Sequence, residues 1–311
     1  MSNPDSGKLS ILISCYNQRD LIGEAIKSFF DQDYENREII VLDDGSSDDS
    51  MAVIAEVAAT APCPVYFSTQ QNRGPSYTFS RLAGLATGDY LLFMGGDDFV
   101  PANCLKGRME KLAADEKLMF VCGLARYFYE DASSTWCSDP ENAVRANGCS
   151  ARTMLAAIKA CTAGSVAEGI ILPAAIIRRS DYRAAGGFST GMKCDDSVLF
   201  YNLFSFAVQI GRKFEVLPEL VFFYRQHAGN TCKNPEEMWV RFSELYTQLG
   251  FNTRRKASFS AYASYMQRVR QSGKWFQIEL LKRIFADPAV IKTLTVGAIC
   301  RDLLFPAFRR F

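Results

Sequence analysis

The stretch Glu38-Ile39-Ile40-Val41-Leu42-Asp43-Asp44-Gly45-Ser46-Ser47-Asp48 decides the fold of this 311-residue chain. Its apolar half predicts a buried strand, and its polar half predicts a tight turn at Gly45 into a capped helix. In open α/β sheets, ligands bind at the carboxyl ends of the strands. Two carboxylates at that edge cannot attract a phosphate, but they can accept hydrogen bonds from a base or a ribose. The alternative is a capped strand-to-helix turn without a ligand.

Apolar runs alternate with segments of helical spacing along the chain. The predicted strands are 9–14, 38–42, 65–68, 90–94, 119–124, 169–172 and 214–217. The predicted helices are 21–30, 51–59, 77–86, 101–118 and 196–210, with a long loop at 129–149 and a helical pattern from 236 onward. Alternating strands and helices predict an α/β fold, in which helices flank a mostly parallel central sheet.

The composition limits the class of protein. The chain is 48% hydrophobic and 22% charged, which is ordinary for a globular protein. Its ten cysteines show no metal-binding spacing, so we expect reduced thiols in a cytoplasmic protein. Residues 1–8 lack a signal-peptide core, and no apolar run approaches the roughly 20 residues that span a bilayer.

A basic tail follows an acidic body. Residues 251–311 contain 12 Lys and Arg and three acidic residues, although the net charge of the whole chain is only +1. Apolar side chains recur at helical spacing among basic ones between 274 and 285. One interpretation is peripheral binding to an anionic membrane surface on its inner face, and the alternative is a helical cap on the preceding domain. No nucleic-acid-binding motif accompanies the basic excess, so we expect no nucleic-acid partner.

A second acidic pair ends the predicted strand 90–94. Asp97 and Asp98 follow Gly95 and Gly96, and adjacent carboxylates repel each other unless a cation lies beside them. Hard oxygen ligands at a strand end suit Mg²⁺ or Mn²⁺ held together with substrate phosphates. The alternative is a solvated turn.

Six short motifs occur in order along the chain. They are Ile13-Ser14-Cys15-Tyr16-Asn17, Asp43 to Asp48, Asn72-Arg73-Gly74, Arg81-Leu82-Ala83-Gly84-Leu85, Gly88-Asp89-Tyr90 and Asp97-Asp98. Together they resemble the inverting family 2 glycosyltransferases of the GT-A fold, over about residues 9–231. The resemblance implies a nucleotide-sugar-binding half at 1–100, an acceptor-binding half at 101–235 and a basic C-terminal helical region at 236–311.

The resemblance also implies roles for individual residues. Those expected to contact the donor nucleotide are Ser14, Tyr16, Asn17, Asp43, Asp44, Arg81 and Asp97. Those expected to hold a divalent cation, Mn²⁺ or Mg²⁺, are Asp97, Asp98 and His227, and Arg225 and His227 are expected at the leaving diphosphate. Many members have an Asp where this chain has Gly95, which leaves the exact ligand set open.

His227 is the only histidine of the chain, and it ends the segment Phe223-Tyr224-Arg225-Gln226-His227. This segment resembles the Tyr-Arg-x-His of the family. The alternative is a surface histidine with no chemical role.

The segment Gly186-Gly187-Phe188, followed by Asp195 and Asp196, also resembles the family. A sugar hydroxyl must lose its proton as it attacks the anomeric carbon, and a positioned carboxylate can accept that proton. We expect Asp196 to be this base, with Asp195 in support. Direct attack opposite the leaving group inverts the anomeric centre and needs no carboxylate nucleophile. The alternative is that both carboxylates cap the following helix.

The implied function is sugar transfer from a nucleotide-diphosphate donor, with UDP expected by analogy, to a glycan or lipid-linked saccharide acceptor in surface polysaccharide or glycoconjugate synthesis. Two alternatives stay open. A sugar nucleotidyltransferase typically carries a Gly-rich basic loop after the first strand, which residues 14–18 lack. A non-catalytic nucleotide-sugar-binding protein could keep the fold without an acid at Gly95.

Overall fold

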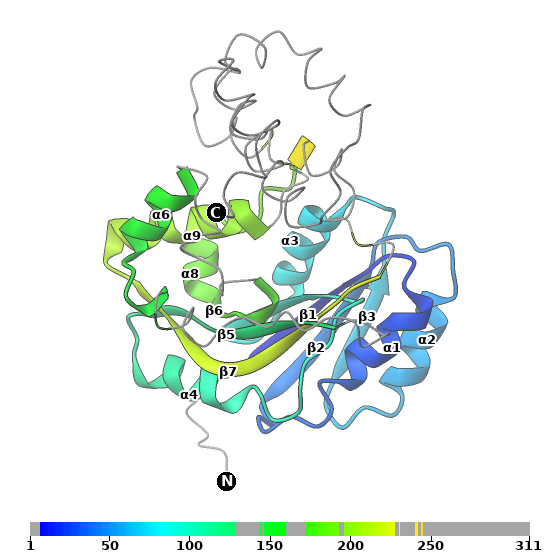
Figure 1. Cartoon of the computed structure of the whole chain (residues 1–311). Helices are drawn as coiled ribbons and strands as arrows, with labels where there is room; N and C mark the ends of the chain where they lie inside the picture. Colours follow the sequence, from blue (N-terminus) through cyan, green and yellow to red (C-terminus); the bar gives the residue numbers. More distant parts are fainter. Residues whose placement is uncertain are drawn as a thin grey trace, which may run out of the picture. The chain divides into compact units, whose positions relative to one another are not determined.

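A computed structural model gives the fold of the chain (Figure 1). It describes residues 7–128, 144, 146–159, 172–192, 196–227, 230, 240, 241 and 244. The chain forms two compact units, one of Met1–Gly191 with Asp195–His227 and one of Met192–Cys194 with Ala228–Phe311. The elements below belong to the first unit. The predicted basic helical region 236–311 lies outside the described residues, apart from 240, 241 and 244.

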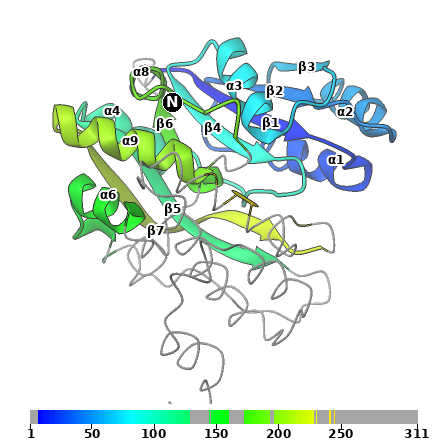
Figure 2. The same cartoon turned by 90° about the horizontal axis from the view of Figure 1, so that it is seen from above.

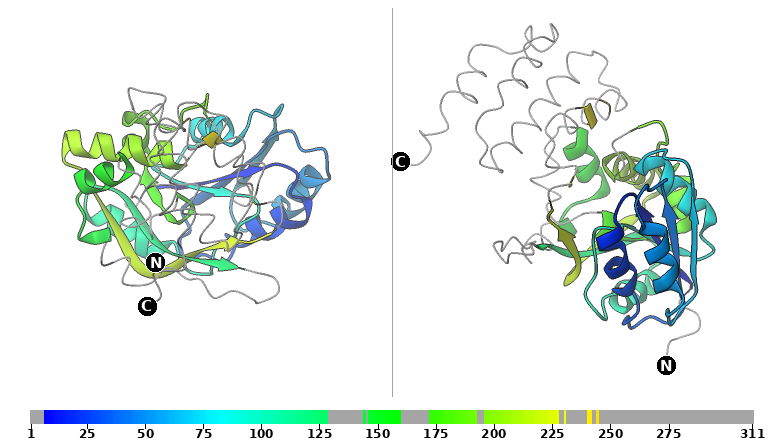
Figure 3. Two further views of the ribbon diagram at one scale, coloured as in Figure 1. Left: turned by 45° about the horizontal axis from the view of Figure 1, so that its top comes forward. Right: turned by 90° about the vertical axis from the view of Figure 1, so that its right-hand side faces the viewer.

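The first four strands form a parallel sheet with β1 at its centre. The strands are β1 (Leu9–Cys15), β2 (Arg37–Asp43), β3 (Val65–Thr69) and β4 (Tyr90–Gly95), and the helices between them are α1 (Arg19–Lys27), α2 (Ser50–Ala58) and α3 (Pro75–Leu85). β2 and β4 flank β1, and β3 pairs with β2. Right-handed crossovers in this order put α1 and α2 on one face of the sheet and α3 on the other (Figure 3).

Burial on both faces explains why the sequences of β1, β2 and β4 read as apolar runs, whereas β3, at the edge of the sheet, has no buried residue. Every residue of β2 is buried, and in β1 and β4 all but one residue of each strand is buried. Parallel strands that are covered by helices on both sides require such runs. The predicted mostly parallel sheet flanked by helices is therefore confirmed.

The rest of the sheet is mixed. Its order is β3-β2-β1-β4-β6-β5-β7, with β5 (Leu118–Phe128), β6 (Ile176–Arg178) and β7 (Lys213–Arg225). β6 is antiparallel to both β4 and β5, whereas β5 and β7 are parallel. The accompanying helices are α4 (Lys106–Ala114), α6 (Ala151–Lys159), α8 (Arg179–Ala184) and α9 (Asp196–Ile210). Helix α6 lies beside α9 (Figure 2).

Several predicted boundaries differ from the structure. Leu172, predicted to end a strand, opens a 3-10 turn (Leu172–Ala174), and the strand of this region is β6. The predicted helix 101–118 starts only at Lys106, because Asn103 has a left-handed backbone (φ 55°) and the carboxylate of Asp33 caps the later start. Within the predicted loop 129–149, residues 144, 146 and 147 are helical.

Strand β7 extends well beyond the predicted segment 214–217. Cys122 of β5 pairs with Val216, but Leu124 pairs with Leu220, so that Gly123 alone faces three residues of β7, including Pro218. A Cβ on Gly123 would lie 2.5 Å from a methyl carbon of Val221. Because Pro218 lies in this bulge, its missing N–H does not interrupt the ladder.

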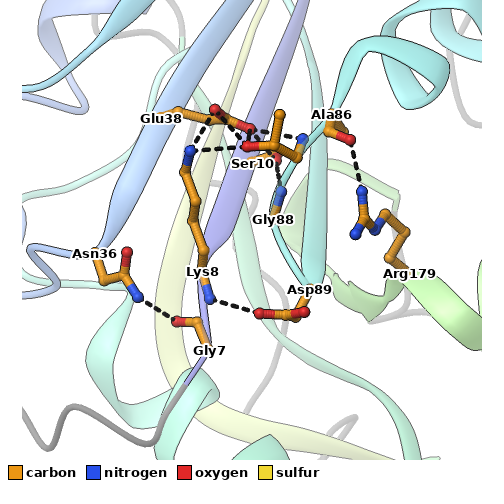
Figure 4. Close-up of polar contacts among 10 residues, drawn as sticks. Gly7, Lys8, Ser10, Asn36, Glu38, Ala86, Gly88, Asp89 and Arg179 are labelled. Atoms are coloured by element: carbon orange, nitrogen blue, oxygen red, sulfur yellow. Dashed lines mark hydrogen bonds and ion pairs between the residues drawn. The ribbon is translucent and has the colours of Figure 1, made fainter.

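A buried carboxylate ties together the amino ends of three strands (Figure 4). Glu38 of β2 accepts hydrogen bonds from Lys8 Nζ (2.6 Å), Ser10 Oγ (2.6 Å) and Thr87 N (2.9 Å). Gly88 N donates to Ser10 Oγ at 2.9 Å, and a Cβ on Gly88 would lie 2.5 Å from the carbonyl oxygen of Lys8. The close approach of the segments around Lys8 and Gly88 therefore requires a glycine at residue 88.

Two further observations concern the described residues alone. The cysteines at 15, 63, 104 and 149 are free thiols. In the described part of the chain, no helix has the length and apolar character that a membrane span requires.

Candidate functional site

The strand register brings the predicted polar residues to one edge of the sheet. Cys15 at the end of β1 pairs with Asp43 at the end of β2, and Asp43 also pairs with Thr69 of β3. On the other side of β1, Ser14 pairs with Gly95, the last residue of β4. The carboxyl ends of four parallel strands therefore lie at one level, which is where ligands bind in sheets of this kind.

Asp43 shapes the turn after β2. Its carboxylate accepts hydrogen bonds from Ser46 N (3.1 Å), from the Ser46 hydroxyl and from Thr69 Oγ1 (2.9 Å). Gly45, inside this turn, has a left-handed backbone (φ 78°). The side chain of Asp43 is fully buried, so its contacts within the protein serve to hold the turn.

Asp44 holds the segment that precedes α3. It is only 3% exposed, and its carboxylate accepts hydrogen bonds from Gln70 Nε2, Arg73 N and Gly74 N, each at 2.8 Å. Gln70 in turn accepts a hydrogen bond from Arg81 Nη1 at 2.8 Å, which links the exposed Arg81 to Asp44. Gln70 was not predicted, although a polar residue close behind the predicted strand 65–68 was a usable signal.

The segment after β1 is fastened to the turn after β2. Asn17 has a left-handed backbone (φ 51°), its N–H donates to Ser46 Oγ at 2.8 Å, and its Oδ1 accepts from Ser47 N at 2.8 Å. Asn tolerates this conformation better than most residues. Tyr16 remains half exposed beside this clasp, and Ser14 contributes its carbonyl oxygen to Gly96 N at 2.8 Å.

A carboxylate and the single histidine meet at the end of β4. Asp97 Oδ2 lies 3.1 Å from His227 Nε2, and both side chains are partly exposed. Asp98 is 5% exposed, and its Oδ1 accepts a hydrogen bond from Arg225 N at 2.9 Å. Burial raises the pKa of Asp98 well above its usual value, and the charge of Asp97 adds to that rise.

The orientation of Asp97 depends on the glycine two residues before it. A Cβ on Gly95 would lie 2.6 Å from Asp97 Oδ1. The Asp97 carboxylate thus occupies the space in which a side chain at residue 95 would begin. The observed position of Asp97 therefore requires a residue without a side chain at position 95.

Arg225, at the end of β7, is buried behind this corner. Its Nε donates to the carbonyl oxygen of Asp97 at 3.0 Å, and its Nη2 forms an ion pair with the carboxylate of Glu24 on α1. The guanidinium carbon lies 5.0 Å from the ring centroid of Phe99 and 5.3 Å from that of Phe128. Glu24 was not predicted, because its partner is 201 residues away and neither residue signals the other in sequence.

Asp196 begins helix α9. It is exposed, and its Oδ1 accepts a hydrogen bond from Ser197 N at 2.6 Å. Asn202, one and a half turns further along α9, donates to the carbonyl oxygen of Gly187 at 3.2 Å, and the ring of Phe188 stacks on Phe79 of α3 at 5.4 Å. These contacts join α9 to the face of the sheet that α3 covers. Asp195 lies outside the described residues.

Asp97 and His227 fit a divalent cation that is shared with a ligand. Their ligand atoms are close enough together to contact one ion. Among the residues that the structure describes, no group of three or more His, Cys, Asp or Glu side chains is arranged to hold a metal. Mg²⁺-type sites with one or two protein carboxylates are completed by water and substrate phosphates, and here Asp97 supplies one carboxylate with the His227 nitrogen beside it.

The sheet and its strand order are those of the GT-A fold. The family model "Glycosyl transferase family 2" matches residues 10–184, more than half of the chain, and the chain belongs to this family. The family resemblance inferred from the six motifs is thereby confirmed.

Two relatives illustrate the range of the family. The chain is 30% identical over 143 residues to the uncharacterized glycosyltransferase YibD of Escherichia coli, a match that covers 46% of this chain and 41% of YibD. It is 33% identical over 117 residues, or 37% of each chain, to the GalNAc(5)-diNAcBac-PP-undecaprenol beta-1,3-glucosyltransferase of Campylobacter jejuni. The matched region thus spans less than half the length of these relatives.

Solved structures share the fold over most of the chain. Staphylococcus aureus TarS 1-349 in complex with UDP-GlcNAc has a TM-score of 0.62 at 16% identity, with 92% of this chain and 79% of that chain covered. The mannosyltransferase PcManGT of Pyrobaculum calidifontis, in complex with GDP-Man and Mn²⁺, has a TM-score of 0.56 at 18% identity, with 94% and 85% covered. At such identities the likeness establishes the fold alone.

Proposed function

We propose that this protein transfers a sugar, with inversion at the anomeric carbon, from a nucleoside-diphosphate donor to a saccharide acceptor that is a glycan or is carried on a lipid. The observation that carries the proposal is the Asp97–His227 pair at the end of β4, beside the polar turns after β1 and β2. Donor complexes of the same fold with UDP-GlcNAc and GDP-Man, and a relative named for an undecaprenol-linked acceptor, support it.

The donor nucleotide would lie along the carboxyl ends of β1, β2 and β3. Tyr16 and Arg81 are exposed at this edge and suit direct contact. The described hydrogen bonds of Asn17, Asp43 and Asp44 are to the turns around them. We therefore propose that these residues fix the shape of the nucleotide site. The turns after β1 and β2 would hold the groups that contact the base and the ribose in a fixed position.

Asp97 and His227 would hold Mn²⁺ or Mg²⁺ together with the donor diphosphate. When bound, the cation neutralises charge that develops on the leaving nucleoside diphosphate. Asp98, which is buried against the backbone of Arg225, would support this corner from behind. The phosphate contact predicted for Arg225 has little support, because its guanidinium is buried against Phe99 and Phe128 and its Nη2 is paired with Glu24.

Asp196 would accept the proton of the attacking hydroxyl. It is exposed at the start of a helix that lies on the α3 face, where a carboxylate is accessible to an acceptor hydroxyl. The hydroxyl oxygen bonds to the anomeric carbon while the bond to the diphosphate oxygen breaks. The proton passes to the carboxylate, and the electron pair leaves with the nucleoside diphosphate.

A donor screen tests the proposal. Purified protein is incubated with UDP- and GDP-sugars and Mn²⁺, and thermal stabilisation and release of free nucleoside diphosphate are measured with and without saccharide acceptors. A true donor raises the melting temperature by mass action, and EDTA is expected to reduce both signals. Pyrophosphate release from a nucleoside triphosphate would favour a nucleotidyltransferase, and donor binding without any transfer or hydrolysis would favour a non-catalytic binding protein.

Gly95→Ala is expected to weaken the cation site. The added methyl group would lie 2.6 Å from Asp97 Oδ1, so the carboxylate must move and its contact with His227 is disturbed. We expect the Mn²⁺ dissociation constant, measured by calorimetry in the presence of UDP, to rise about tenfold. Gly84→Ala on α3 is the matched control, because a Cβ there meets no atom within 4 Å. Equal Mn²⁺ affinity in the two variants would contradict the assignment.

The predicted contact of the basic C-terminal region with an anionic membrane surface stays a prediction. It would bring a lipid-linked acceptor to the protein, and the donor screen can include such an acceptor in vesicles.

A further inference from the structure

We infer that Glu24 is a positioning residue of the cation site, which acts through the buried Arg225 on the corner formed by Asp97 and His227. The inference rests on the proposed function. It adds Glu24 on α1, which lies outside all of the quoted motifs, to the residues that form the site.

Arg225 ties three parts of the corner together. Its backbone N–H donates to Asp98 Oδ1 at 2.9 Å, and its side chain Nε donates to the Asp97 carbonyl oxygen at 3.0 Å. His227, two residues later in the chain, lies 3.1 Å from Asp97 Oδ2. The position of the guanidinium therefore bears on the backbone of Asp97 and on the segment that carries His227.

The position of the guanidinium is set by its surroundings. Its carbon lies 5.0 Å from the ring centroid of Phe99 and 5.3 Å from that of Phe128, and because these two centroids are themselves only 5.0 Å apart, both rings contact the guanidinium from one side. Its Nη2 forms an ion pair with Glu24, which helps to hold the group against the two rings. A planar guanidinium with aromatic rings beside it and a carboxylate on Nη2 is a well-defined arrangement, which a lysine would not reproduce.

Glu24 can be changed without disturbing a packed core. Its side chain is 55% exposed, and it lines a surface cavity of about 500 Å³ between α1, α2 and Phe99. Its neighbour Asp20 lines the same cavity, is 90% exposed and pairs only loosely with Arg19 at 3.7 Å. Asp20→Asn and Glu24→Gln each remove one negative charge from α1. Glu24 is paired with Arg225, whereas the described ion pair of Asp20 is with Arg19, so Asp20→Asn is the matched control.

The single histidine provides a direct readout. With ring-labelled histidine, the protein gives one imidazole signal by NMR, and that signal comes from His227. In the metal-free protein, Glu24→Gln is expected to shift this signal and Asp20→Asn to leave it unchanged. With Mn²⁺ and UDP, Glu24→Gln is expected to raise the Mn²⁺ dissociation constant about tenfold, the scale typical of residues that orient metal ligands.

A double-mutant cycle separates positioning from a general loss of stability. If Glu24 acts through the corner, Glu24→Gln should add less than about a twofold further loss of Mn²⁺ affinity in a His227→Gln background. A purely structural role would give the same loss in both backgrounds, and an unchanged histidine signal in Glu24→Gln would overturn the inference. Wild-type protein that fails to bind Mn²⁺ with UDP would count against the proposed function, whereas the metal-free spectra decide the role of Glu24.

Discussion

Asp196→Asn is expected to lower the turnover number for sugar transfer by about 10²- to 10⁴-fold, the usual contribution of a general base. The carboxylate is exposed at the start of α9, and its described hydrogen bond to Ser197 N is one that an Asn side chain can also accept. Asn is as good a helix cap as Asp, so the fold should be retained. Donor affinity, measured by calorimetry with UDP-sugar and Mn²⁺, should change little.

The same substitution distinguishes the base from a helix cap. Asp49→Asn, at the N-cap of α2 with a 75% exposed side chain, is the matched control and should keep wild-type turnover. If Asp196→Asn keeps near-normal turnover and the melting temperature of the two variants is alike, the carboxylate serves only to cap α9. The acceptor proton would then have to go to another group.

Glu38→Gln is expected to cost up to about 3 kcal/mol of folding free energy at pH 7. Burial alone would raise the pKa of Glu38, but hydrogen bonds from Lys8, Ser10 and Thr87 outweigh it and lower the pKa from 4.5 to about 2. That difference corresponds to about 3 kcal/mol of linkage, an upper value because Lys8 is partly exposed. Urea unfolding at pH 7 measures the loss.

The pH dependence follows from the direction of this pKa. A carboxylate whose pKa is lowered on folding stabilises the protein fully above its unfolded value of 4.5, and the contribution disappears as the pH falls towards about 2. The difference in unfolding free energy between wild type and Glu38→Gln should therefore shrink from pH 5 to pH 2. Glu56→Gln, an exposed site on α2, is the control. A difference that stays constant over this range would show that the charge of Glu38 contributes nothing.

β1, β2 and β4 could be predicted from sequence because strands that are buried on both faces consist of apolar runs. β2 shows this most clearly, since all of its residues are buried and five of them formed the predicted strand. β6 could not be predicted, because three residues between a 3-10 turn and α8 carry no periodic signal. In β7, the predicted segment ends at residue 217, and the bulge opposite Gly123 shows how the strand continues past Pro218.

Some residues of the candidate site could likewise be predicted from sequence, and others could not. Asp43, Asp44, Asp97 and Asp98 could be placed from sequence, because carboxylates that directly follow predicted parallel strands must gather at one edge. Which carboxylates are turned inward could not be predicted, since the donors that Asp44 meets are mostly backbone N–H groups of a loop. The pairing of Glu24 with Arg225 depends on the packing of α1 against the far end of β7, and no local pattern records it.

The position of β6 has a consequence for the protein during translation. β1, β2, β3 and β4 pair with one another and are complete once Gly95 has left the ribosome. β5 is finished at residue 128, but its two neighbours in the sheet begin only at residues 176 and 213. A nascent chain thus carries an eleven-residue apolar strand whose final partners have not yet been made. Open strand edges are templates for pairing between chains, so this interval of synthesis is when aggregation competes most directly with folding.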